Sequence, residues 1–428
     1  MTRYRAAWVL PIGRPPIHNG WVDVEGGRVR GVGGPEGPPE KVGPAASSGG
    51  PERAALPDVG DAVSSGGDEH DLGQVALMPG LVNAHTHLEL SYLRDRVPPA
   101  KDFVAWIRGV MAEQRLRSDA SAAEILRGVD RGIDEAVASG TALVGDISNT
   151  LVTFDRLVAS PLAAVVFNEV IRFKTSDADK VVDDALRRIR ALTPTDLVRP
   201  ALAAHAPYSV APGVFRALRR AADRDGLSPP SVHLAESAAE VELIKAGTGP
   251  WRALLEEVSA WDPAWTPAGV SPVEYLDREG FLDGQAIAVH GVQMSPADLA
   301  RLASRGTTLV ACPRSNAQTG AGTPPIDAFY ASGVQVAVGT DSLASTPDLN
   351  MFSELAAMRA LAPSVPASAL LASATRQGAR ALGLGAEFGA IEPGMRARLL
   401  AVTFPPGTRD VEEYLVNGVR PAQIRWIP

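Results

Sequence analysis

The sequence has a single cysteine, Cys312, in a chain of 428 residues. An intramolecular disulfide bond is therefore impossible, and the cysteine content is compatible with a reducing compartment. Cys312 lies in an apolar run, and no unassigned basic side chain is evident near it. We expect a buried strand residue there and no catalytic thiol.

Long apolar runs and clusters of basic residues are missing as well. A membrane-spanning helix needs about 18–20 apolar residues in succession, and no stretch has that length. The short apolar run at the N-terminus ends in the prolines between Pro11 and Pro16 and lacks the features of a signal peptide. The net charge of −8 argues against nucleic acid as a partner. We expect a cytoplasmic protein that acts on a small molecule, without membrane or nucleic-acid partners.

The first 32 residues show the pattern of short strands, with a hairpin turn at Glu25, Gly26 and Gly27. Residues 33–74 are rich in glycine, proline, serine and acidic side chains, and this composition predicts a long flexible loop. His70 lies in this segment, where we expect a solvated side chain.

Strand patterns return after residue 390, at 397–404, 413–421 and 423–428. Neither flank of the chain is large enough to fold alone. We therefore predict one composite β-sandwich domain built from residues 1–76 and 391–428.

Between these flanks, residues 77–390 alternate short apolar runs with amphipathic helical stretches. Alternation of this kind, repeated eight times, predicts an α/β fold, namely a (β/α)₈ barrel of the TIM type. A doubly wound open sheet is the alternative, but eight equivalent units favour closure. The strand patterns lie at 75–85, 141–148, 163–170, 198–207, 230–237, 286–292, 307–313 and 334–342.

Two segments exceed this minimal repeat. Residues 100–118 predict a long amphipathic helix that carries Phe103 and Trp106. Residues 248–285 hold three of the seven tryptophans. An aromatic insertion on a strand-to-helix loop could roof an active site, or it could pack on the outside of the barrel, and the sequence leaves both open.

Chemistry-bearing side chains gather where the predicted strands end, which is the face that carries the active site in such barrels. Five of the seven histidines lie at predicted strand ends, and acidic residues accompany them. Packing does not readily explain this distribution. The residues are His85 and His87 on the first strand, His205 on the fourth, His233 with Glu236 on the fifth, His290 on the sixth and Asp341 on the eighth.

Three neutral imidazoles and one carboxylate suit a divalent ion such as Zn²⁺, with Fe²⁺ as the alternative. His85, His87, His233 and Asp341 would supply these ligands, since residues two apart on a strand point the same way. An ion of this kind lowers the pKa of a bound water to about 7. Asp341 could also take a proton from that water, while Glu236 shuttles one to the substrate.

The motifs around these residues resemble the amidohydrolase superfamily, and they are most similar to its mononuclear deaminase branch. They read PGLVNAHTH, HAPYS, HLAE, VHG and GTDS, in this order. Cytosine, guanine and adenosine-type deaminases and triazine hydrolases belong to that branch. The resemblance implies the same four metal ligands, catalytic roles for Glu236 and His290, and contact of His205 with substrate. It also implies a barrel with a split β-sandwich domain and, because relatives are often dimers or larger, a homodimer.

The fourth strand lacks a lysine, and this bears on the number of metal ions. Binuclear members bridge two ions with a modified lysine there, whereas this segment reads RPALAAHAPYS, which favours one ion. Glu169 could still act as a bridging carboxylate or contact substrate; its alternative role is a rim salt bridge with Arg172. The other class of deaminases needs a Pro-Cys-x-x-Cys zinc motif, which one cysteine cannot provide.

The resemblance implies hydrolytic deamination of a ring amidine, with Glu236 delivering a proton to the adjacent ring nitrogen. Within the branch, THLELS, FVAWIRGV, GVSPVEYLDREGFLDG and CPRSN look similar to the aminodeoxyfutalosine deaminases of menaquinone biosynthesis, which act on an adenosine carrying a benzoate group. Cleavage of another C–N or C–Cl bond, as in a triazine chlorohydrolase, is one alternative. A catalytically inactive barrel that serves as a scaffold is another.

The residues that select substrate are less sharply defined by the sequence. Glu89 and Ser91 follow the metal histidines and could bind a ribose or ring edge, or else cap a helix and pack. A substrate carboxylate could pair with Arg172, Arg314 or Arg94, although each could instead form a surface salt bridge. Trp106 completes the set of candidate substrate-binding residues.

Overall fold

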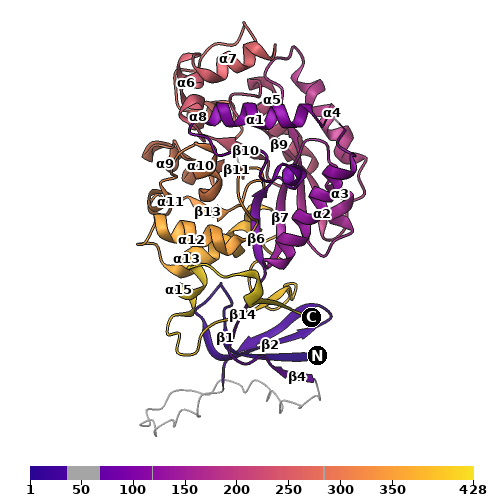
Figure 1. The fold of residues 1–428 in the computed structure, drawn as a ribbon, viewed down its shortest axis with the longest axis vertical. Coiled ribbons are helices and arrows are strands. Elements are labelled where there is room, and N and C mark those ends of the chain that lie inside the picture. Colours follow the sequence, from indigo (N-terminus) through magenta and orange to yellow (C-terminus); the bar gives the residue numbers. More distant parts are fainter. Residues whose placement is uncertain (36–67, 118, 283–284) are drawn as a thin grey trace, which may run out of the picture.

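The computed structural model describes residues 1–35, 68–117, 119–282 and 285–428. Figure 1 shows a large barrel with a smaller sheet at one end, and this sheet contains both termini. Most of the predicted loop at 33–74 therefore lies outside the described residues. None of the helices in the described ranges is long and apolar enough to cross a lipid bilayer.

The barrel predicted from the sequence is confirmed, with eight parallel strands paired in chain order. A bridge between Thr86 and Asp341 links the last strand segment to the first and closes the circle. The strands are β6 (Leu81–Thr86), β7 (Thr141–Ser148), β8 (Ala163–Val170), β9 (Val198–Ala204), β10 (Ser231–Leu234), β11 (Ile287–His290), β12 (Thr308–Ala311) and β13 (Gln335–Val338).

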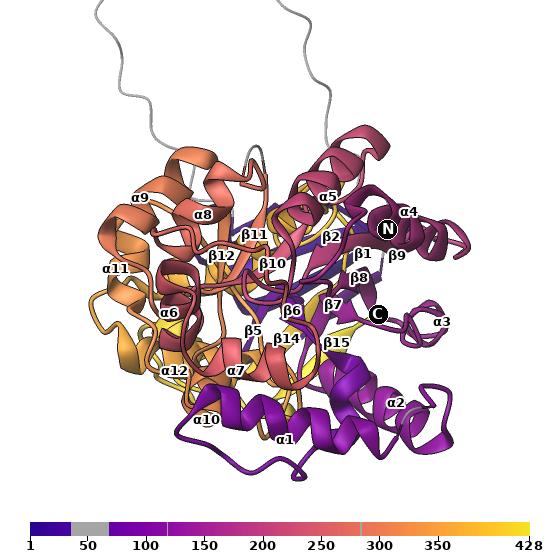
Figure 2. The same ribbon diagram turned by 90° about the horizontal axis from the view of Figure 1, so that it is seen from above.

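Helices surround these strands, as the view from above in Figure 2 shows. The helices described are η1 (Leu88–Leu93), α1 (Phe103–Arg115), α2 (Ala123–Ala138), α3 (Phe154–Val158), α4 (Ala178–Arg190), α5 (Pro212–Asp225), α6 (Ala238–Ala246), α7 (Pro250–Glu257), α8 (Pro272–Arg278), α9 (Pro296–Arg305), α10 (Pro313–Thr319), α11 (Ile326–Ala331), α12 (Met351–Leu361), α13 (Ala367–Ala372), η2 (Ser373–Gln377), α14 (Gly378–Ala381), α15 (Val411–Val416) and η3 (Pro421–Gln423).

Local sequence explains why these elements begin and end where they do. The strands β6, β7 and β8 are buried along their whole length, as parallel strands covered by helices must be. Ser295 and Asp298 form the expected capping box at the start of α9, and Gly306 ends that helix in the left-handed conformation. Asp102 caps α1 by accepting a hydrogen bond from the amide of Ala105 at 2.9 Å.

The flanks of the chain join in one seven-stranded mixed sheet, in the order β15-β14-β5-β1-β2-β3 with β4 beside β1. Its buried side chains form a core of their own, which includes Val9, Val22, Leu77 and Ile427. The strands are β1 (Thr2–Val9), β2 (Ile17–Glu25), β3 (Arg28–Gly33), β4 (Asp68–Asp71), β5 (Val75–Pro79), β14 (Leu399–Thr403) and β15 (Ile424–Ile427).

The passage from this sheet to the barrel lies at Gly80. The boundary expected after residue 76 falls inside β5, which pairs with β14 as far as Pro79. A Cβ atom on Gly80 would lie 2.5 Å from the Cβ of Ala142, so glycine permits the close approach of the chain to the next barrel strand.

Two expectations for the flanks were wrong. Residues 413–421 do not form a strand, because α15 occupies Val411–Val416 and is capped by Asp410, which accepts a hydrogen bond from the amide of Glu413 at 2.9 Å. Residues 68–71 form β4 and not a loop; there Glu69 pairs with Arg5 at 2.5 Å, and composition alone did not reveal this pairing. His70 is exposed, as expected.

Candidate active site

The barrel brings the four expected metal ligands to one point. The Nε2 atoms of His85 and His87 are 3.2 Å apart, and those of His87 and His233 are 3.4 Å apart. The Oδ1 atom of Asp341 lies 3.4 Å from Nε2 of His87 and 3.7 Å from Nε2 of His85. Ligand atoms held about 2.0–2.1 Å from a tetrahedral ion are about 3.3–3.4 Å from one another. The four atoms therefore fit a single small divalent ion.

Hydrogen bonds turn the ligand atoms of His233 and Asp341 toward the common point. Nδ1 of His233 donates to the backbone oxygen of His205 at 2.8 Å, which leaves Nε2 of His233 free as a ligand. The second carboxylate oxygen of Asp341 accepts hydrogen bonds from the hydroxyl groups of Ser315, at 2.5 Å, and Ser345, at 2.9 Å. The backbone of Asp341 is fixed too, since its amide donates to the oxygen of His85 at 3.1 Å.

The protonation states of the cluster agree with metal binding. Burial lowers the pKa of His87 well below its usual value and that of His233 to about 4, so both imidazoles are neutral near pH 7. Burial opposes ionisation of Asp341, but a hydrogen bond from His85 and the neighbouring histidines hold the pKa of Asp341 well below its usual range. Neutral imidazoles and an ionised carboxylate are the forms that bind a metal.

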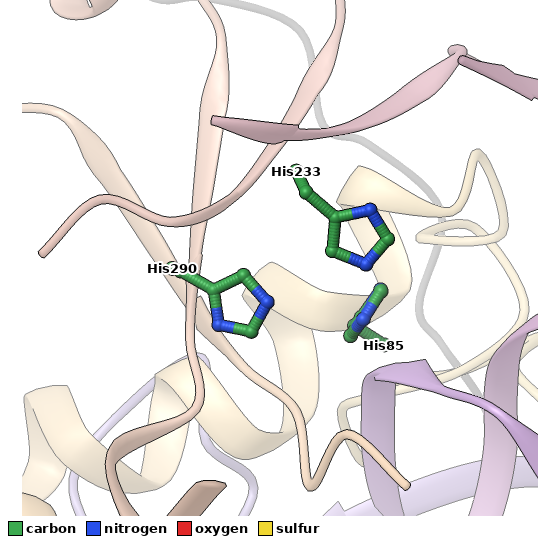
Figure 3. A group of neighbouring side chains, drawn as sticks. All are labelled: His85, His233 and His290. Atoms are coloured by element: carbon green, nitrogen blue, oxygen red, sulfur yellow. The ribbon is translucent and has the colours of Figure 1, made fainter. Parts of the chain in front are cut away.

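Glu236 and His290 face each other beside this cluster. Oε1 of Glu236 lies 3.5 Å from Nε2 of His290, and both side chains are almost fully buried. Burial raises the pKa of Glu236 well above its usual value, with Asp341 and Glu240 contributing. Figure 3 shows the ring of His290 beside those of His85 and His233.

A cavity of about 660 Å³ opens over these residues. His87, Glu236, His290 and Asp341 line its floor. The opposite wall is mainly apolar and comes from α1, α7 and the loop that follows β8. This wall includes Phe103, Trp106, Ile107, Val110, Met111, Ile171, Arg172, Phe173, Lys174, Trp251, Leu254, Leu255 and Val258.

A sequence model described as the amidohydrolase family matches residues 76–420. The chain belongs to the amidohydrolase family. It is 33% identical over 349 residues to the aminodeoxyfutalosine deaminase of Deinococcus radiodurans, covering 76% of this chain and 80% of that one. It is 29% identical over 375 residues to a 5-methylthioadenosine/S-adenosylhomocysteine deaminase of Moorella thermoacetica, covering 83% and 80% of the two chains.

Solved structures share the fold of this amidohydrolase. An adenosine deaminase from Xanthomonas campestris with bound zinc is 27% identical, with a TM-score of 0.79 over 99% of this chain and 90% of that one. The aminofutalosine deaminase of Helicobacter pylori, in complex with methylthio-coformycin, has a TM-score of 0.80 at 22% identity, over 99% and 100% of the chains. The predicted family and fold are thus confirmed.

The segment at 248–285 roofs the amidohydrolase cavity through α7. Trp251 lines the cavity and stacks on Tyr208, with ring centroids 3.7 Å apart. Trp261 stacks on Phe173 farther out, at 5.5 Å. The indole nitrogens of Trp106 and Trp251 are buried and have no hydrogen-bond partner among the described residues. The wall therefore offers aromatic surface.

The expected substrate-binding residues after the metal histidines do not reach the cavity floor. Glu89 accepts hydrogen bonds from Ser148, at 2.5 Å, and from the amide of Thr150, at 3.1 Å, and it lines a neighbouring cavity of about 500 Å³. Ser91 packs against α2, where a Cβ atom on Gly132 would lie 2.5 Å from its hydroxyl oxygen. Both residues hold η1 in place.

The three candidate arginines differ in position. Arg314 pairs with Asp348 at 2.8 Å and lies 3.5 Å from Glu354, and Arg94 pairs with Glu135. Arg172 is exposed at the edge of the cavity, and no ion-pair or hydrogen-bond partner of its guanidinium occurs in the described part of the chain. Lys174, nearby on the same loop, is also exposed and has no ion-pair or hydrogen-bond partner among the described residues. Arg172 thus remains the arginine suited to an anionic substrate group.

Glu169 and His205 lie side by side on the cavity wall. Glu169 accepts a hydrogen bond from Asn149 at 2.7 Å, and its other oxygen lies 3.7 Å from Nδ1 of His233. Glu169 therefore does not form a salt bridge with Arg172, which was its alternative role. Burial raises the pKa of Glu169 and lowers that of His205 to about 4.

Several residues that support the site went unrecognised in the sequence. Ser315 binds Asp341, and the amide of Asn316, oriented with its nitrogen toward His290, donates to Nδ1 of that ring at 3.0 Å. Both belong to the CPRSN segment directly after β12. Their position after a strand end was the available signal, but only Arg314 and Cys312 of that segment were considered. Cys312 itself is buried, as expected.

Proposed function

We propose that this amidohydrolase catalyses hydrolytic deamination of an adenosine derivative, and that its substrate carries a benzoate group, as aminodeoxyfutalosine does. The observation that carries the proposal is the composition of one cavity. Its floor joins the cluster of four candidate metal ligands to a buried carboxyl group, that of Glu236, whose pKa is raised by burial. Its wall is aromatic, and its edge presents two cations without partners, Arg172 and Lys174, among the described residues. The named activities of the Deinococcus and Moorella relatives support the same reaction class.

In this proposal His85, His87, His233 and Asp341 hold one divalent ion, which supplies a water acidic enough to attack near neutral pH. Asp341 takes a proton from that water. Glu236 delivers its proton to the ring nitrogen beside the attacked carbon. Asp341 passes its proton to the amino group, the carbon–nitrogen bond breaks and ammonia leaves, while the added hydroxyl returns a proton to Glu236 and becomes the C=O group of the ring.

His290 and His205 bind and orient the reacting ring in this scheme. Because Nδ1 of His290 accepts from Asn316, the proton of the neutral ring resides on Nε2, which faces Glu236. That N–H can donate to the oxygen added to the ring carbon. His205, whose Nδ1 lies 2.5 Å from the hydroxyl of Ser209, presents its other nitrogen as a contact for substrate.

The far end of the substrate meets the wall of the cavity. An aromatic ring fits the apolar surface of α1 and α7, which includes Trp106 and Trp251. A carboxylate on that ring would pair with Arg172, and Lys174 adds positive charge beside it. A neutral 5-methylthioadenosine uses the wall less fully and leaves the two cations unpaired.

We further propose Zn²⁺ as the ion, because the Xanthomonas neighbour contains zinc. A lone, buried cysteine agrees with a cytoplasmic enzyme. We also retain the homodimer as a proposal, which light scattering of the purified protein would test. A place in menaquinone biosynthesis follows only if the benzoate-bearing nucleoside is the substrate.

Ammonia release tests the proposal directly. Purified enzyme would be assayed with aminodeoxyfutalosine, 5-methylthioadenosine, S-adenosylhomocysteine, adenosine, cytosine, guanine and atrazine, with adenine absorbance and chloride followed in parallel. We expect the highest kcat/KM for aminodeoxyfutalosine. Ammonia from none of these compounds would overturn the deaminase proposal, and chloride from atrazine would favour the chlorohydrolase alternative. Complete inactivity with a bound metal would revive the scaffold hypothesis.

A further inference from the structure

The chain makes an unusual turn between β10 and α6. Ala235 has a φ of +52°, in the left-handed region that residues with a Cβ atom rarely adopt. In a straight strand, residues three apart point to opposite faces. Here His233 and Glu236 line the same cavity although they are three residues apart. The turn at Ala235 therefore places the proton carrier beside the metal ligand.

Glu240, in the first turn of α6, binds this turn directly. One carboxylate oxygen accepts a hydrogen bond from the amide of Ala235 at 2.8 Å, and the other accepts from the amide of Glu236 at 2.9 Å. On the opposite side, the backbone oxygen of Ala235 accepts from the amide of Gln293 at 2.8 Å. The strained residue is thus held through both of its backbone polar groups.

Helix capping alone does not account for Glu240. Ser237 already caps α6 by accepting a hydrogen bond from the amide of Glu240 at 3.3 Å. In an ordinary capping box the acidic side chain returns only to the amide of the cap residue, whereas this one also binds the amides of the two residues before the cap. The side chain is fully buried, which disfavours a carboxylate, and burial raises the pKa of Glu240 to about 8. A buried acid at this place suggests a task beyond ending the helix.

We propose that Glu240 is a positioning residue, whose two hydrogen bonds to the backbone maintain the left-handed turn at Ala235 and so aim the carboxyl group of Glu236 into the cavity. This inference rests on the proposed function, because Glu236 carries the proton only in that scheme.

The test compares Glu240→Gln and Glu240→Ala with Ser237→Ala. Glutamine offers one acceptor oxygen where the carboxylate offers two, so we expect kcat to fall about tenfold in Glu240→Gln and about a hundredfold in Glu240→Ala. KM should change less than twofold, and the metal content should stay at the wild-type level. Ser237→Ala removes a hydrogen bond at the same helix end. Ser237→Ala should lower Tm about as much as the Glu240 substitutions do, and it should leave kcat unchanged.

Two kinetic outcomes would overturn the inference. One is an unchanged kcat in both Glu240 variants, and the other is an equal fall of kcat in Ser237→Ala. Hydrogen exchange at the amides of Ala235 and Glu236 gives a readout that needs no turnover. Exchange should accelerate in Glu240→Ala but not in Ser237→Ala, and equal rates in the two variants would again contradict the inference. If the wild-type enzyme released no ammonia, the proposed function would fail, and the exchange rates would still decide whether Glu240 holds the turn.

Discussion

The two ends of the catalytic cavity are built differently. At the metal end, His85, His233 and Asp341 are buried on or beside strands, and hydrogen bonds to neighbouring groups fix the orientation of His233 and Asp341. At the open end, the wall consists of helices and a loop, and Arg172 and Lys174 are exposed there. The metal end is organised before substrate arrives, whereas the open end acquires its ion pairs only with a ligand. We interpret the first as the part that fixes the reaction and the second as the part that selects the substrate.

Replacing Glu236 by glutamine should give the largest effect and leave the metal in place. The amide cannot carry the proton, and loss of such a group typically lowers kcat by about 10²–10⁴-fold. Ammonia release measures kcat, and elemental analysis measures metal per chain. His233→Ala is the matched comparison, because it should lose both metal and activity. Loss of metal in Glu236→Gln would show that Glu236 is a ligand and not the proton carrier.

Arg172→Ala should act at the open end alone. A charge-assisted hydrogen bond contributes about 1.5–3 kcal/mol to binding. Because Arg172 is exposed, we expect its loss to cost an amount near the lower limit, which is about tenfold in kcat/KM. We expect this loss for a nucleoside that bears a carboxylate and almost none for 5-methylthioadenosine. Arg314→Ala is the control, since that side chain is already paired with Asp348. An equal loss for both substrates would remove the distinction between the two ends.

This comparison also explains what could be predicted from the sequence. The metal end follows from strand geometry: His85 and His87 are two apart, and the strand ends share one face of the barrel. Eight strand patterns with intervening helices were enough to place them. The partners of Asp341, such as Ser315, come from another strand end 26 residues away in the chain, and their contact depends on how α10 is oriented.

The open end was harder to predict, because helices and loops set its side-chain directions. Ser91 follows His87, which lines the cavity, by only four residues, yet it packs against α2. From the sequence, the 248–285 segment could have covered the cavity or packed on the outside of the barrel. The stacking of Trp251 on Tyr208 places it over the cavity. The error at 413–421 has a similar origin. A short apolar run fits a strand or a helix, and a capping residue, Asp410, decided between them.

A smaller effect concerns a buried acid that supports the metal end. Glu354 in α12 accepts a hydrogen bond from the amide of Arg314 at 3.3 Å, and burial raises its pKa to about 8. An unfolded glutamate has a pKa of about 4.3. The stabilising contribution of the neutral acid is therefore complete below about pH 4 and is lost as the pH rises through about 8.

The Tm of the wild type should consequently fall more between pH 5 and pH 8 than the Tm of Glu354→Gln, which cannot titrate there. Thermal unfolding at the two pH values measures the difference. Glu69→Gln changes an exposed acid in the terminal sheet and should keep the wild-type pH dependence. Parallel shifts of the wild type and Glu354→Gln would contradict the assigned pKa.

The smallest effect is expected far from the cavity, in the terminal sheet. Arg5→Ala breaks the exposed pair with Glu69, and such surface pairs contribute about 0–1 kcal/mol to the free energy of unfolding. Urea unfolding should therefore shift slightly, and kcat should not change. Arg3→Ala, which breaks a partly buried pair with Asp23, should shift it more. A change of kcat in either variant would show that the terminal sheet influences the site.

The most direct test of the account is a metal titration of the metal-free protein during turnover. Zn²⁺ would be added in steps while ammonia release from an adenosine derivative is recorded. The convergence of four ligand atoms on one point predicts activity that rises in proportion to zinc and reaches its plateau at one ion per chain. Full activity without metal, or a plateau that requires two ions per chain, would contradict the account.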